Sequence, residues 1–491
     1  MKSKHSPRRS GLRRIHLPVL LSGGLLVSLP VLADSDTLLQ LPTTQSVGVT
    51  PNVLLLLDDS GSMSFEDTFE GGESKRGYNL VYAWYYKNKQ CQYNGCGVEF
   101  RPIYNLSNDY FCVAENFQAY DPDQTYLPWK KGDGDDRYEN MDPTSAWISF
   151  DQGDSYYNQV DLTDPSLEYR YYTGDKCKDK NEVQVSELGP EEQVNYANWF
   201  TYYRDRLGVG KAAALELLAG TEYRTGYLTI NPRNGSEKAV VDNIVDQIVE
   251  LVTNVLGNLV ELITNSDSGN AHLTEVRDAI VNSEISTSNT YRSTPLREAL
   301  YRAGEYYRDN YSYLGSSPIV SADEGGMCQQ NFTVLITDGF WNSEDSSASS
   351  AIKNNIGDAN GDGRTWRQSN GWSGGKATLA DVAYYYANID LREDLGSGTY
   401  EKQVMTTYTV AFGVDSDSDE WSSKKRVTES SSSTIDDLEQ AAIDGGGSYF
   451  NASSPTDLVS ALAAIASEIV AVGNSVSGLS TNLTTASVET D

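Results

Sequence analysis

The chain is poor in histidine and in basic charge. Only one of its three histidines, His272, lies beyond the first 33 residues. This scarcity excludes a histidine-rich metal site and argues against a Ser-His-Asp hydrolase. Lys and Arg together number 38, against 69 for Asp and Glu, which leaves a formal net charge of −31. Because so acidic a chain repels phosphate backbones, nucleic acid is not an expected partner.

Long apolar runs are absent beyond the first 33 residues, and the run inside them has the pattern of an export signal. A basic segment ending at Arg14 precedes an apolar stretch from about Leu17 to Leu32 and then Ala33, a small residue suited to cleavage. A membrane anchor is the alternative, but the stretch is shorter than the ~20 residues that span a bilayer. We therefore expect residues 1–33 to be a cleaved signal peptide. The mature chain would be exported to the periplasm or outer surface, with no membrane span.

Cysteine is also scarce. Export would place the cysteines in an oxidising compartment, where disulfides persist. Zinc is the poorer alternative, because Cys91 and Cys96 lack the usual CxxC spacing and no histidine is nearby. Four cysteines lie within residues 91–177 and allow three pairings, whereas Cys328 is either free or bonded to that region. The five residues are Cys91, Cys96, Cys112, Cys177 and Cys328.

Two short apolar runs indicate buried strands, and each ends in a polar turn. They are Val53–Leu57 (VLLLL) and Phe332–Ile336 (FTVLI). Strands that alternate with helices predict an α/β fold with a mostly parallel sheet flanked by helices. Further strands are expected at 224–230, 407–414 and 448–451, and helical spacing occurs at 194–219, 237–264, 296–307, 378–388, 435–443 and 456–470.

The composition changes after the first strand. Residues 66–190 are rich in Tyr, Gly, Asp and Asn and show no long periodicity. We interpret them as a large, disulfide-containing insertion in a domain formed by residues 45–65 and 191–471. Residues 472–491 are rich in Ser and Thr and predict a linker or frayed tail.

The tyrosines of the insertion fit two interpretations. Tyrosine suits an adhesive surface, because it offers rigid contact area at low entropic cost, and it equally fills small local cores. The sequence leaves both open. The residues are Tyr82, Tyr85, Tyr86, Tyr93, Tyr104, Tyr110, Tyr156, Tyr157, Tyr169, Tyr171 and Tyr172.

The turn after the first strand has the pattern of a metal site. Asp58, Ser60 and Ser62 present one carboxylate and two hydroxyls at the end of a strand. Mg²⁺ prefers about six oxygen ligands and keeps some of them as water, so this ion could still accept a carboxylate from a partner. An ordinary Asx or Ser turn is the alternative. The position favours the metal site, because parallel sheets bind ligands at the carboxyl ends of their strands.

Three segments resemble the von Willebrand factor A family and its metal-ion-dependent adhesion site. LLLLDDSGSM is similar to the first motif of that family, STPLREAL to its threonine motif and VLITDGFW to its second aspartate motif. Two departures are Ser293, where glycine is common, and the insertions that separate Thr294 from the first motif. The resemblance implies a Rossmann-like fold and a Mg²⁺, Mn²⁺ or Ca²⁺ ion held by Asp58, Ser60, Ser62, Thr294 and Asp338.

A second cation site is suggested by the loop DANGDG. It presents Asp358, Asn360 and Asp362 at positions 1, 3 and 5 of an EF-hand-like calcium loop, with glycine at position 6. Position 12 is Ser369 rather than glutamate, and a distant residue such as Asp381 could replace it. An acidic surface loop without calcium is the alternative.

Longer segments resemble the PilC/PilY family, the tip-associated adhesins and assembly factors of type IV pili. They include AYDPDQTYLPW, NYANWFTYYRDRLGVGKAA and TLADVAYYYANIDLRED, and the resemblance covers roughly residues 45–470. It implies a non-enzymatic role in pilus biogenesis, surface attachment and twitching motility. The implied partners are minor pilins of the tip complex and a host or abiotic surface ligand that offers a carboxylate. In that family a C-terminal β-propeller follows, and the sequence stops at Asp491, where the propeller would begin.

Other functions fit parts of the pattern. An exported adhesin of the same fold could act apart from any pilus. A metal-dependent hydrolase is disfavoured, because the site lacks a histidine or an acidic pair to serve as general base. The amphipathic segment 237–264 packs on the domain in one interpretation and docks pilus subunits in the other.

Overall fold

The computed structural model describes most of one compact unit, Ser46–Asp491. The expected signal peptide at 1–33 and most of the segment 237–264 lie outside the described residues. The described ranges are 49–69, 81–86, 98–103, 106–131, 136–148, 159–173, 181–218, 223–231, 238–241, 267–285, 293–311, 314–342, 351–352, 354–367, 377–395, 402–414, 426–428, 431–452 and 454–485.

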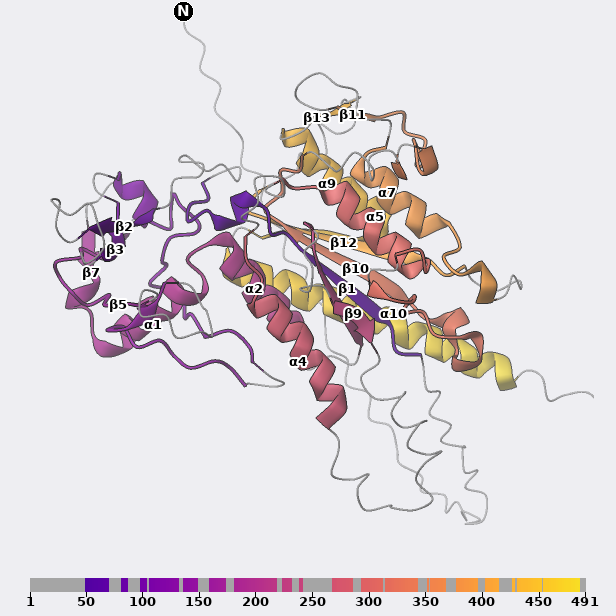
Figure 1. Ribbon diagram of the computed structural model, residues 1–491, viewed down its shortest axis with the longest axis horizontal. Coiled ribbons are helices and arrows are strands. Elements are labelled where there is room, and N and C mark those ends of the chain that lie inside the picture. The colour runs from indigo at the N-terminus through magenta and orange to yellow at the C-terminus, as the bar shows by residue number, and fades with distance from the viewer. Residues whose placement is uncertain are drawn as a thin grey trace, which may run out of the picture. The chain divides into compact units, whose positions relative to one another are not determined.

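A six-stranded sheet forms the centre of the domain (Figure 1). Its strands are β1 (Asn52–Leu57), β8 (Arg224–Thr229), β9 (Lys238–Val241), β10 (Asn331–Thr337), β12 (Met405–Phe412) and β14 (Gly446–Ala452). Their order across the sheet is β14-β12-β10-β1-β8-β9. The first five are parallel, and β9 pairs antiparallel with β8. The predicted α/β class with a mostly parallel sheet is confirmed.

Helices cover both faces of the sheet (Figure 1). One layer contains α5 (Leu296–Tyr307), α7 (Leu379–Asn388) and α9 (Ser432–Asp444). The other contains α2 (Arg206–Leu217), α4 (Asp267–Val281) and α10 (Pro455–Thr485). The predicted flanking helices are therefore confirmed.

Alternate side chains of β1 reach the two layers. Val53, Leu55 and Leu57 join the core of α2, α4 and α10. Leu54 and Leu56 join the core of α5, α7 and α9. All five are fully buried. Because both faces of the strand are covered, its sequence is a continuous apolar run rather than an alternating one.

The helix predicted over 194–219 is in fact two helices. The first is α1 (Pro190–Tyr202), and α2 begins at Arg206. Asp205 caps α2, and its Oδ1 accepts the backbone N–H of Gly208 at 2.7 Å. A side chain that satisfies a free N–H group at a helix start favours a break at that point.

Two further predictions were wrong in part. Residues 238–241, the start of the segment predicted helical at 237–264, form the edge strand β9. Its valines suit a strand, since β-branched side chains pack well on a sheet. Residues 472–485, predicted as a linker or frayed tail, continue α10 to Thr485.

The insertion is built from short antiparallel pairs. They are β2 (Tyr82–Tyr86) with β3 (Val98–Pro102), β4 (Ala146–Trp147) with β5 (Gln159–Val160), and β6 (Arg170–Thr173) with β7 (Asn181–Gln184). A parallel pair outside the insertion joins β11 (Thr365–Arg367) to β13 (Arg426–Thr428). Single 3-10 turns occur at Gly61–Ser64, Asn108–Phe111, Val185–Glu187, Ala322–Glu324, Gly326–Cys328 and Glu393–Leu395.

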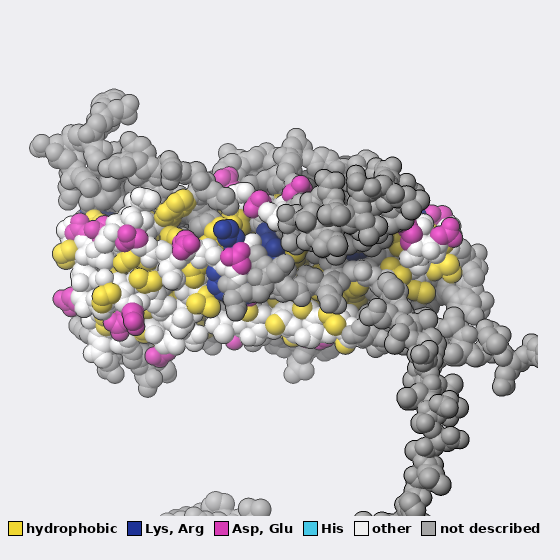
Figure 2. All heavy atoms as spheres, turned by 90° about the horizontal axis from the view of Figure 1, so that it is seen from below, with side chains coloured by type: hydrophobic (Ala, Val, Ile, Leu, Met, Phe, Trp, Pro, Cys, Tyr) yellow, Lys and Arg dark blue, Asp and Glu magenta, His cyan; other side chains and the backbone are white. Residues whose placement is uncertain are grey.

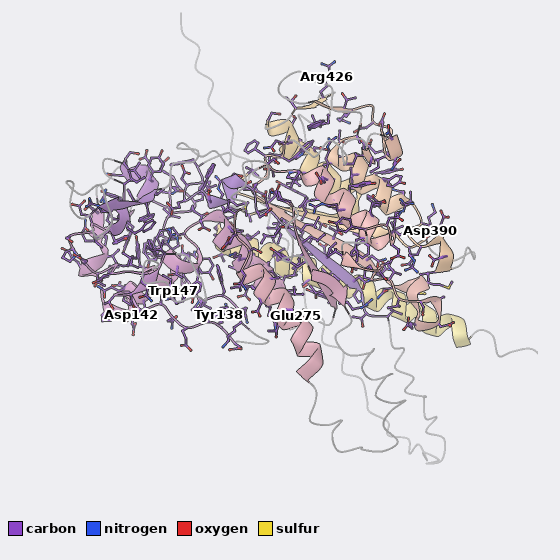
Figure 3. All side chains as sticks on the ribbon, in the orientation of Figure 1. Tyr138, Asp142, Trp147, Glu275, Asp390 and Arg426 are labelled. Atoms are coloured by element: carbon purple, nitrogen blue, oxygen red, sulfur yellow. The ribbon has the colours of Figure 1, made fainter. Side chains whose placement is uncertain are left out.

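Acidic side chains are spread over the described surface. On the face shown in Figure 2 they are scattered singly, whereas the few basic side chains gather near the middle of the view. In Figure 3, Asp142 of the insertion and Glu275 of α4 are two such acidic positions. This distribution agrees with the net charge of −31.

Aromatic rings fill the interior of the insertion. The rings of Tyr82, Phe100, Tyr169 and Phe200 pack with centroids 5.5 to 6.2 Å apart. Four tyrosines in the predicted set, Tyr82, Tyr169, Tyr171 and Tyr172, are buried. For these residues the local-core interpretation holds. Most of the remaining tyrosines lie outside the described residues or have side chains that are not described.

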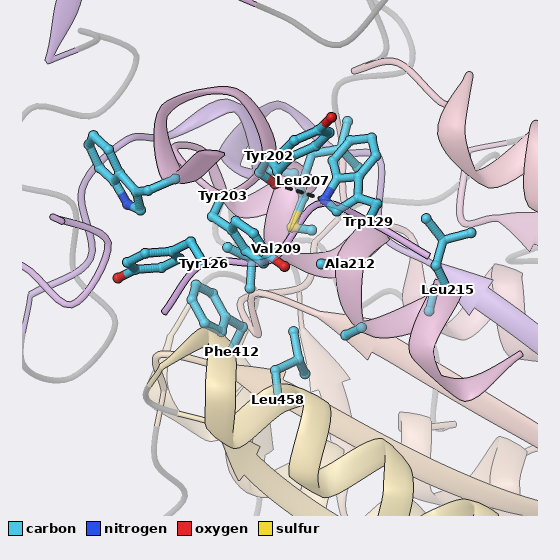
Figure 4. Packing of buried hydrophobic residues seen from close by; sticks show 14 of the residues in the cluster. Tyr126, Trp129, Tyr202, Tyr203, Leu207, Val209, Ala212, Leu215, Phe412 and Leu458 are labelled. Atoms are coloured by element: carbon cyan, nitrogen blue, oxygen red, sulfur yellow. Dashed lines mark hydrogen bonds between the residues drawn. The ribbon is translucent and has the colours of Figure 1, made fainter. Parts of the chain in front are cut away.

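The insertion also packs against the sheet domain. Figure 4 shows Tyr126 and Trp129 of the insertion beside Tyr203 and Leu207, close to α2. The indole N–H of Trp129 donates to Tyr202 O at 2.9 Å. The two regions therefore share one continuous hydrophobic core.

The cysteines are resolved in part. Cys328 is exposed and free, which decides between the two alternatives left by the sequence. Cys112 is buried in the insertion. Cys91, Cys96 and Cys177 lie outside the described residues, so the disulfides of the insertion stay a prediction. Among the described helices, none combines the length and the apolar character needed to cross a bilayer.

Candidate metal centre

The turn after β1 carries the first three predicted ligands. Asp58 continues the pairing with β10, because its backbone N–H donates to Ile336 O at 2.9 Å. Its Oδ1 accepts the N–H of Ser60 at 2.8 Å. The hydroxyl oxygens of Ser60 and Ser62 are 3.1 Å apart. The Asx turn considered as the alternative is therefore present, and it holds the two hydroxyls together on the turn that carries Asp58.

The end of β10 meets this turn through Thr337. Its hydroxyl donates to Asp58 Oδ2 at 2.6 Å, and it accepts the N–H of Gly339 at 3.1 Å. Gly339 has φ of 108°, and a Cβ at this position would approach Val414 Cγ2 to 2.3 Å. Only glycine tolerates both conditions. The order Thr-Asp-Gly thus shapes the turn that carries Asp338.

Thr294 enters from the start of α5. Its N–H donates to Asn342 Oδ1 at 2.8 Å, and its carbonyl accepts the N–H of Asn342 at 3.0 Å. The preceding Ser293 O accepts from Asn231 Nδ2 at 3.0 Å. Asn231, just beyond β8, also donates its backbone and side-chain N–H groups to Asp59 Oδ1, each at 3.0 Å. Hydrogen bonds therefore join the turns after β1 and β8 to α5, and α5 to the turn after β10.

The site contains two buried carboxylates. Asp58 is 0% exposed and Asp338 is 2% exposed. Burial, together with the charge of Asp338, raises the pKa of Asp58 from 3.8 to about 8, although hydrogen bonds from Ser60 and Thr337 oppose the increase. A cation bound between these carboxylates would relieve their repulsion.

The donor set fits a hard divalent ion. Carboxylate and hydroxyl oxygens suit Mg²⁺, Mn²⁺ or Ca²⁺ rather than a soft metal. Within the described ranges no three His, Cys, Asp or Glu side chains form a metal-binding group. The hydroxyls of Ser60, Ser62 and Thr294, together with water, would therefore have to complete the coordination.

One cationic side chain already contacts the site. Arg206, the first residue of α2, donates from Nη1 to Asp338 Oδ2 at 2.8 Å, and both side chains are 2% exposed. Arg206 therefore balances the charge of Asp338. The sequence did not indicate this residue, because a helical pattern carries no mark of a contact with a turn 132 positions away.

Curated relatives match most of the chain. Type IV pilus biogenesis factor PilY1 of Pseudomonas aeruginosa strain PAO1 is 25% identical over 525 residues, which cover 92% of this chain. The proteins of the same name in strains PAK and UCBPP-PA14 are 24% and 23% identical, again over 92% of it. The chain is therefore similar to PilY1 proteins over most of its own length. It spans 41% of the length of these relatives. No protein-family model and no solved structure matches it.

The structure places all five predicted ligands at the carboxyl ends of strands or just before α5. Asp58, Ser60 and Ser62 lie on one turn, and Asp338 is near enough to raise the pKa of Asp58. Thr294 is buried and joins the network through its backbone.

Besides Arg206, three further residues of the network were not predicted from the sequence. Thr337 directly precedes Asp338, and Asn231 directly follows the end of the strand β8, so their positions at strand ends could have indicated them. Asn342 gives no such indication. Its contact with Thr294 depends on how the turn after β10 folds.

The second predicted cation loop is held by several local hydrogen bonds. Asp358 Oδ1 accepts the N–H of Gly363 at 3.2 Å, and Asp362 pairs with Arg364 at 2.8 Å. The backbone N–H of Asn360 donates to Asp381 Oδ1 at 3.2 Å. Asp381 therefore contacts the backbone of the loop, but its replacement of the missing glutamate and a calcium ion there stay predictions.

Proposed function

We propose that this chain acts in type IV pilus biogenesis and surface attachment as an exported, non-enzymatic protein that binds a divalent cation. Its α/β domain would be von Willebrand factor A-like. The observation that carries the proposal is the meeting of Asp58 and Asp338 in one buried site, from turns at the ends of two neighbouring strands. The likeness to PilY1 relatives supports the pilus role.

The proposed ion would be held by five residues. These are Asp58, Ser60, Ser62, Thr294 and Asp338. A bound Mg²⁺ supplies a Lewis-acidic position that a carboxylate from outside can take. The protein contributes the buried carboxylates that attract the ion and the hydrogen-bonded turns that hold them in place.

The acidity of the chain explains why a cation would be useful for attachment. A net charge of −31 repels acidic ligands and anionic surfaces at long range. A divalent ion at the carboxyl ends of the strands offers one local point where an acidic group can bind. We propose minor pilins of the tip complex, and a host or abiotic surface that presents carboxylates, as the partners.

The direct test replaces Asp58 by Asn in the natural host and in the purified protein. Asp58→Asn keeps the side-chain shape and removes the charge. We expect Mg²⁺ affinity, measured by isothermal titration, to fall by at least about 10-fold. We also expect surface attachment to fall while circular dichroism is unchanged. The matched control is Asp142→Asn, an exposed position on the insertion (Figure 3), which should behave as wild type.

The outcomes separate the alternatives. Wild-type Mg²⁺ binding and attachment in Asp58→Asn would contradict a role for the ion at this site. Reduced attachment with normal numbers of pili in a strain that lacks the protein would favour an adhesin that works apart from the pilus.

A further inference from the structure

Arg206 connects the candidate metal centre to the base of the insertion. Its guanidinium donates from Nη1 to Asp338 Oδ2 at 2.8 Å, from Nε to Thr68 Oγ1 at 3.0 Å and from Nη2 to Asp67 O at 2.9 Å. Its backbone N–H donates to Phe65 O at 3.2 Å, and the guanidinium lies 5.3 Å from the centre of the Phe65 ring. The side chain is 2% exposed, so water competes little with these contacts.

The segment that Arg206 holds is in turn bonded to the interior of the insertion. The N–H of Thr68 donates to Asn116 Oδ1 at 2.7 Å, and Thr68 O accepts the N–H of Phe117 at 2.7 Å. The side chain of Thr68 therefore accepts a hydrogen bond from Arg206, whereas its backbone is hydrogen-bonded to the insertion. Thr68 thus provides one connection between the guanidinium and the insertion.

Glu66 makes a second connection in the same segment. Its Oε2 accepts the N–H groups of Val81 at 2.7 Å and Tyr82 at 2.9 Å, and its Oε1 pairs with Arg204 at 2.8 Å. Arg204 lies 4.2 Å from the ring centre of Phe200, in the middle of the aromatic core. Buried contacts thus run without a break from Asp338 to the core of the insertion.

We propose that Arg206 is a positioning residue that couples cation binding at Asp338 to the hydrogen bonds that fix residues 65–69. The inference rests on the proposed metal site. A cation bound to Asp338 shares the carboxylate that Arg206 uses and repels the guanidinium, so binding weakens the Arg206–Asp338 pair. Because the guanidinium is rigid and planar, a shift away from Asp338 also disturbs its bonds to Asp67 and Thr68.

The coupling works in both directions. Linkage requires that a change in the insertion alters cation affinity by the same factor by which the cation alters the insertion. A partner that displaced residues 65–69 would therefore change the affinity of the ion site without touching the ion. In this arrangement the insertion regulates the site.

The test is amide hydrogen exchange of the wild-type chain in EDTA and in saturating Mg²⁺. We expect the amides of Thr68 and Phe117 to exchange about fivefold faster or more with Mg²⁺, a coupling of the usual size. Arg206→Lys retains the positive charge, but an ammonium cannot reproduce the three hydrogen bonds that the planar guanidinium donates. This variant should still bind Mg²⁺, with an affinity changed by no more than the coupling factor of about fivefold, and should lose the Mg²⁺-dependent change at both amides.

Arg224→Lys is the matched control. Arg224 is likewise buried and donates to Asn52 Oδ1 at 3.0 Å, but it lies at the amino ends of the strands, opposite the site. It should retain the full Mg²⁺-dependent change, so general loosening of the fold is distinguished from loss of coupling.

Each result supports or overturns the inference. The coupling is overturned if wild type binds Mg²⁺ but the exchange of the Thr68 and Phe117 amides does not change. It is also overturned if Arg206→Lys shows the same Mg²⁺-dependent change as wild type. Either result leaves the metal site intact. Absence of Mg²⁺ binding by wild type overturns the proposed metal site and the coupling with it.

Discussion

Continuous backbone pairing between long parallel strands holds the central sheet together, whereas aromatic rings and single side-chain amides hold the insertion together. β1 is buried between two helix layers, and parallel neighbours on both sides satisfy its backbone. The insertion has only short strand pairs, so single side chains bond its backbone instead. Asn198 of α1, for example, accepts the N–H of Met141 and donates to Tyr126 O, both at 2.9 Å. The backbone of the sheet is thus satisfied by its own strands, whereas the backbone of the insertion depends on side chains of elements such as α1.

The largest expected loss of stability comes from a substitution in the aromatic core and should be confined to the insertion. Phe200 is fully buried and its ring contacts those of Tyr82, Phe100 and Tyr169. Phe200→Ala should cost about 4 kcal/mol, because it leaves a cavity among aromatic rings. Hydrogen exchange should show faster exchange in the insertion and unchanged protection in β1. Equal loss of protection in both regions would show that they unfold as one unit.

A slightly smaller loss of stability is expected from a substitution in the core of the sheet. Leu55, in the middle of β1, is fully buried between the helix layers. Leu55→Ala should cost about 3 kcal/mol in urea unfolding and should expose both regions together, because the insertion is anchored on elements that pack against the sheet. If the insertion kept its exchange protection while the sheet lost it, the insertion would not depend on the sheet.

Asn116 tests how far the insertion depends on single amides. It accepts the N–H groups of Thr68 and Gln118, and its Nδ2 donates to Glu66 O at 3.2 Å. Asn116→Ala leaves these buried groups without partners and should lower the free energy of unfolding of the insertion by about 2 kcal/mol. The loss should appear in exchange of the Thr68 amide. A loss below about 0.5 kcal/mol would mean that water replaces the amide.

Per pH unit, the smallest expected change in the free energy of unfolding concerns the helix layer of the sheet. Asp437 accepts the N–H groups of Leu379 at 2.8 Å and Ala380 at 3.0 Å. Burial raises the pKa of Asp437 from 3.8 to about 7. Because the folded pKa is the higher one, the stabilisation from Asp437 is complete below about pH 4 and is lost as the pH rises to about 7.

Urea unfolding of wild type and Asp437→Asn between pH 4 and 7 measures this contribution. The variant cannot titrate at this position, so its stability should decrease less steeply with pH, by up to about 1 kcal/mol per unit. Parallel pH curves for the two proteins would contradict the raised pKa. Exchange in the insertion should show no difference between them.

The same contrast explains what the sequence could predict of the fold. β1 and β10 were found because strands buried on both faces are short apolar runs. The insertion was identified only by composition, since its core is made by rings from distant residues such as Tyr82 and Phe200. The edge strand β9 was mistaken for helix, because four residues at an edge give too short a pattern to distinguish the two.

The residues of the candidate site that come directly after a strand could be predicted from the sequence. Asp58, Ser60 and Ser62 lie in one motif, and Asp338 follows a buried strand, so position and residue type indicated them. Arg206 was not predictable, since its contact with Asp338 exists only after α2 and β10 are packed.

We propose above that the turns after β1 and β10 and the start of α5 hold one divalent cation. Anomalous diffraction from a crystal soaked in Mn²⁺ tests it most directly. We predict one strong peak within coordination distance of Asp58 and the hydroxyls of Ser60 and Ser62, with Thr294 and Asp338 around it. A well-ordered site without anomalous density, in a crystal that shows Mn²⁺ elsewhere, would contradict the claim.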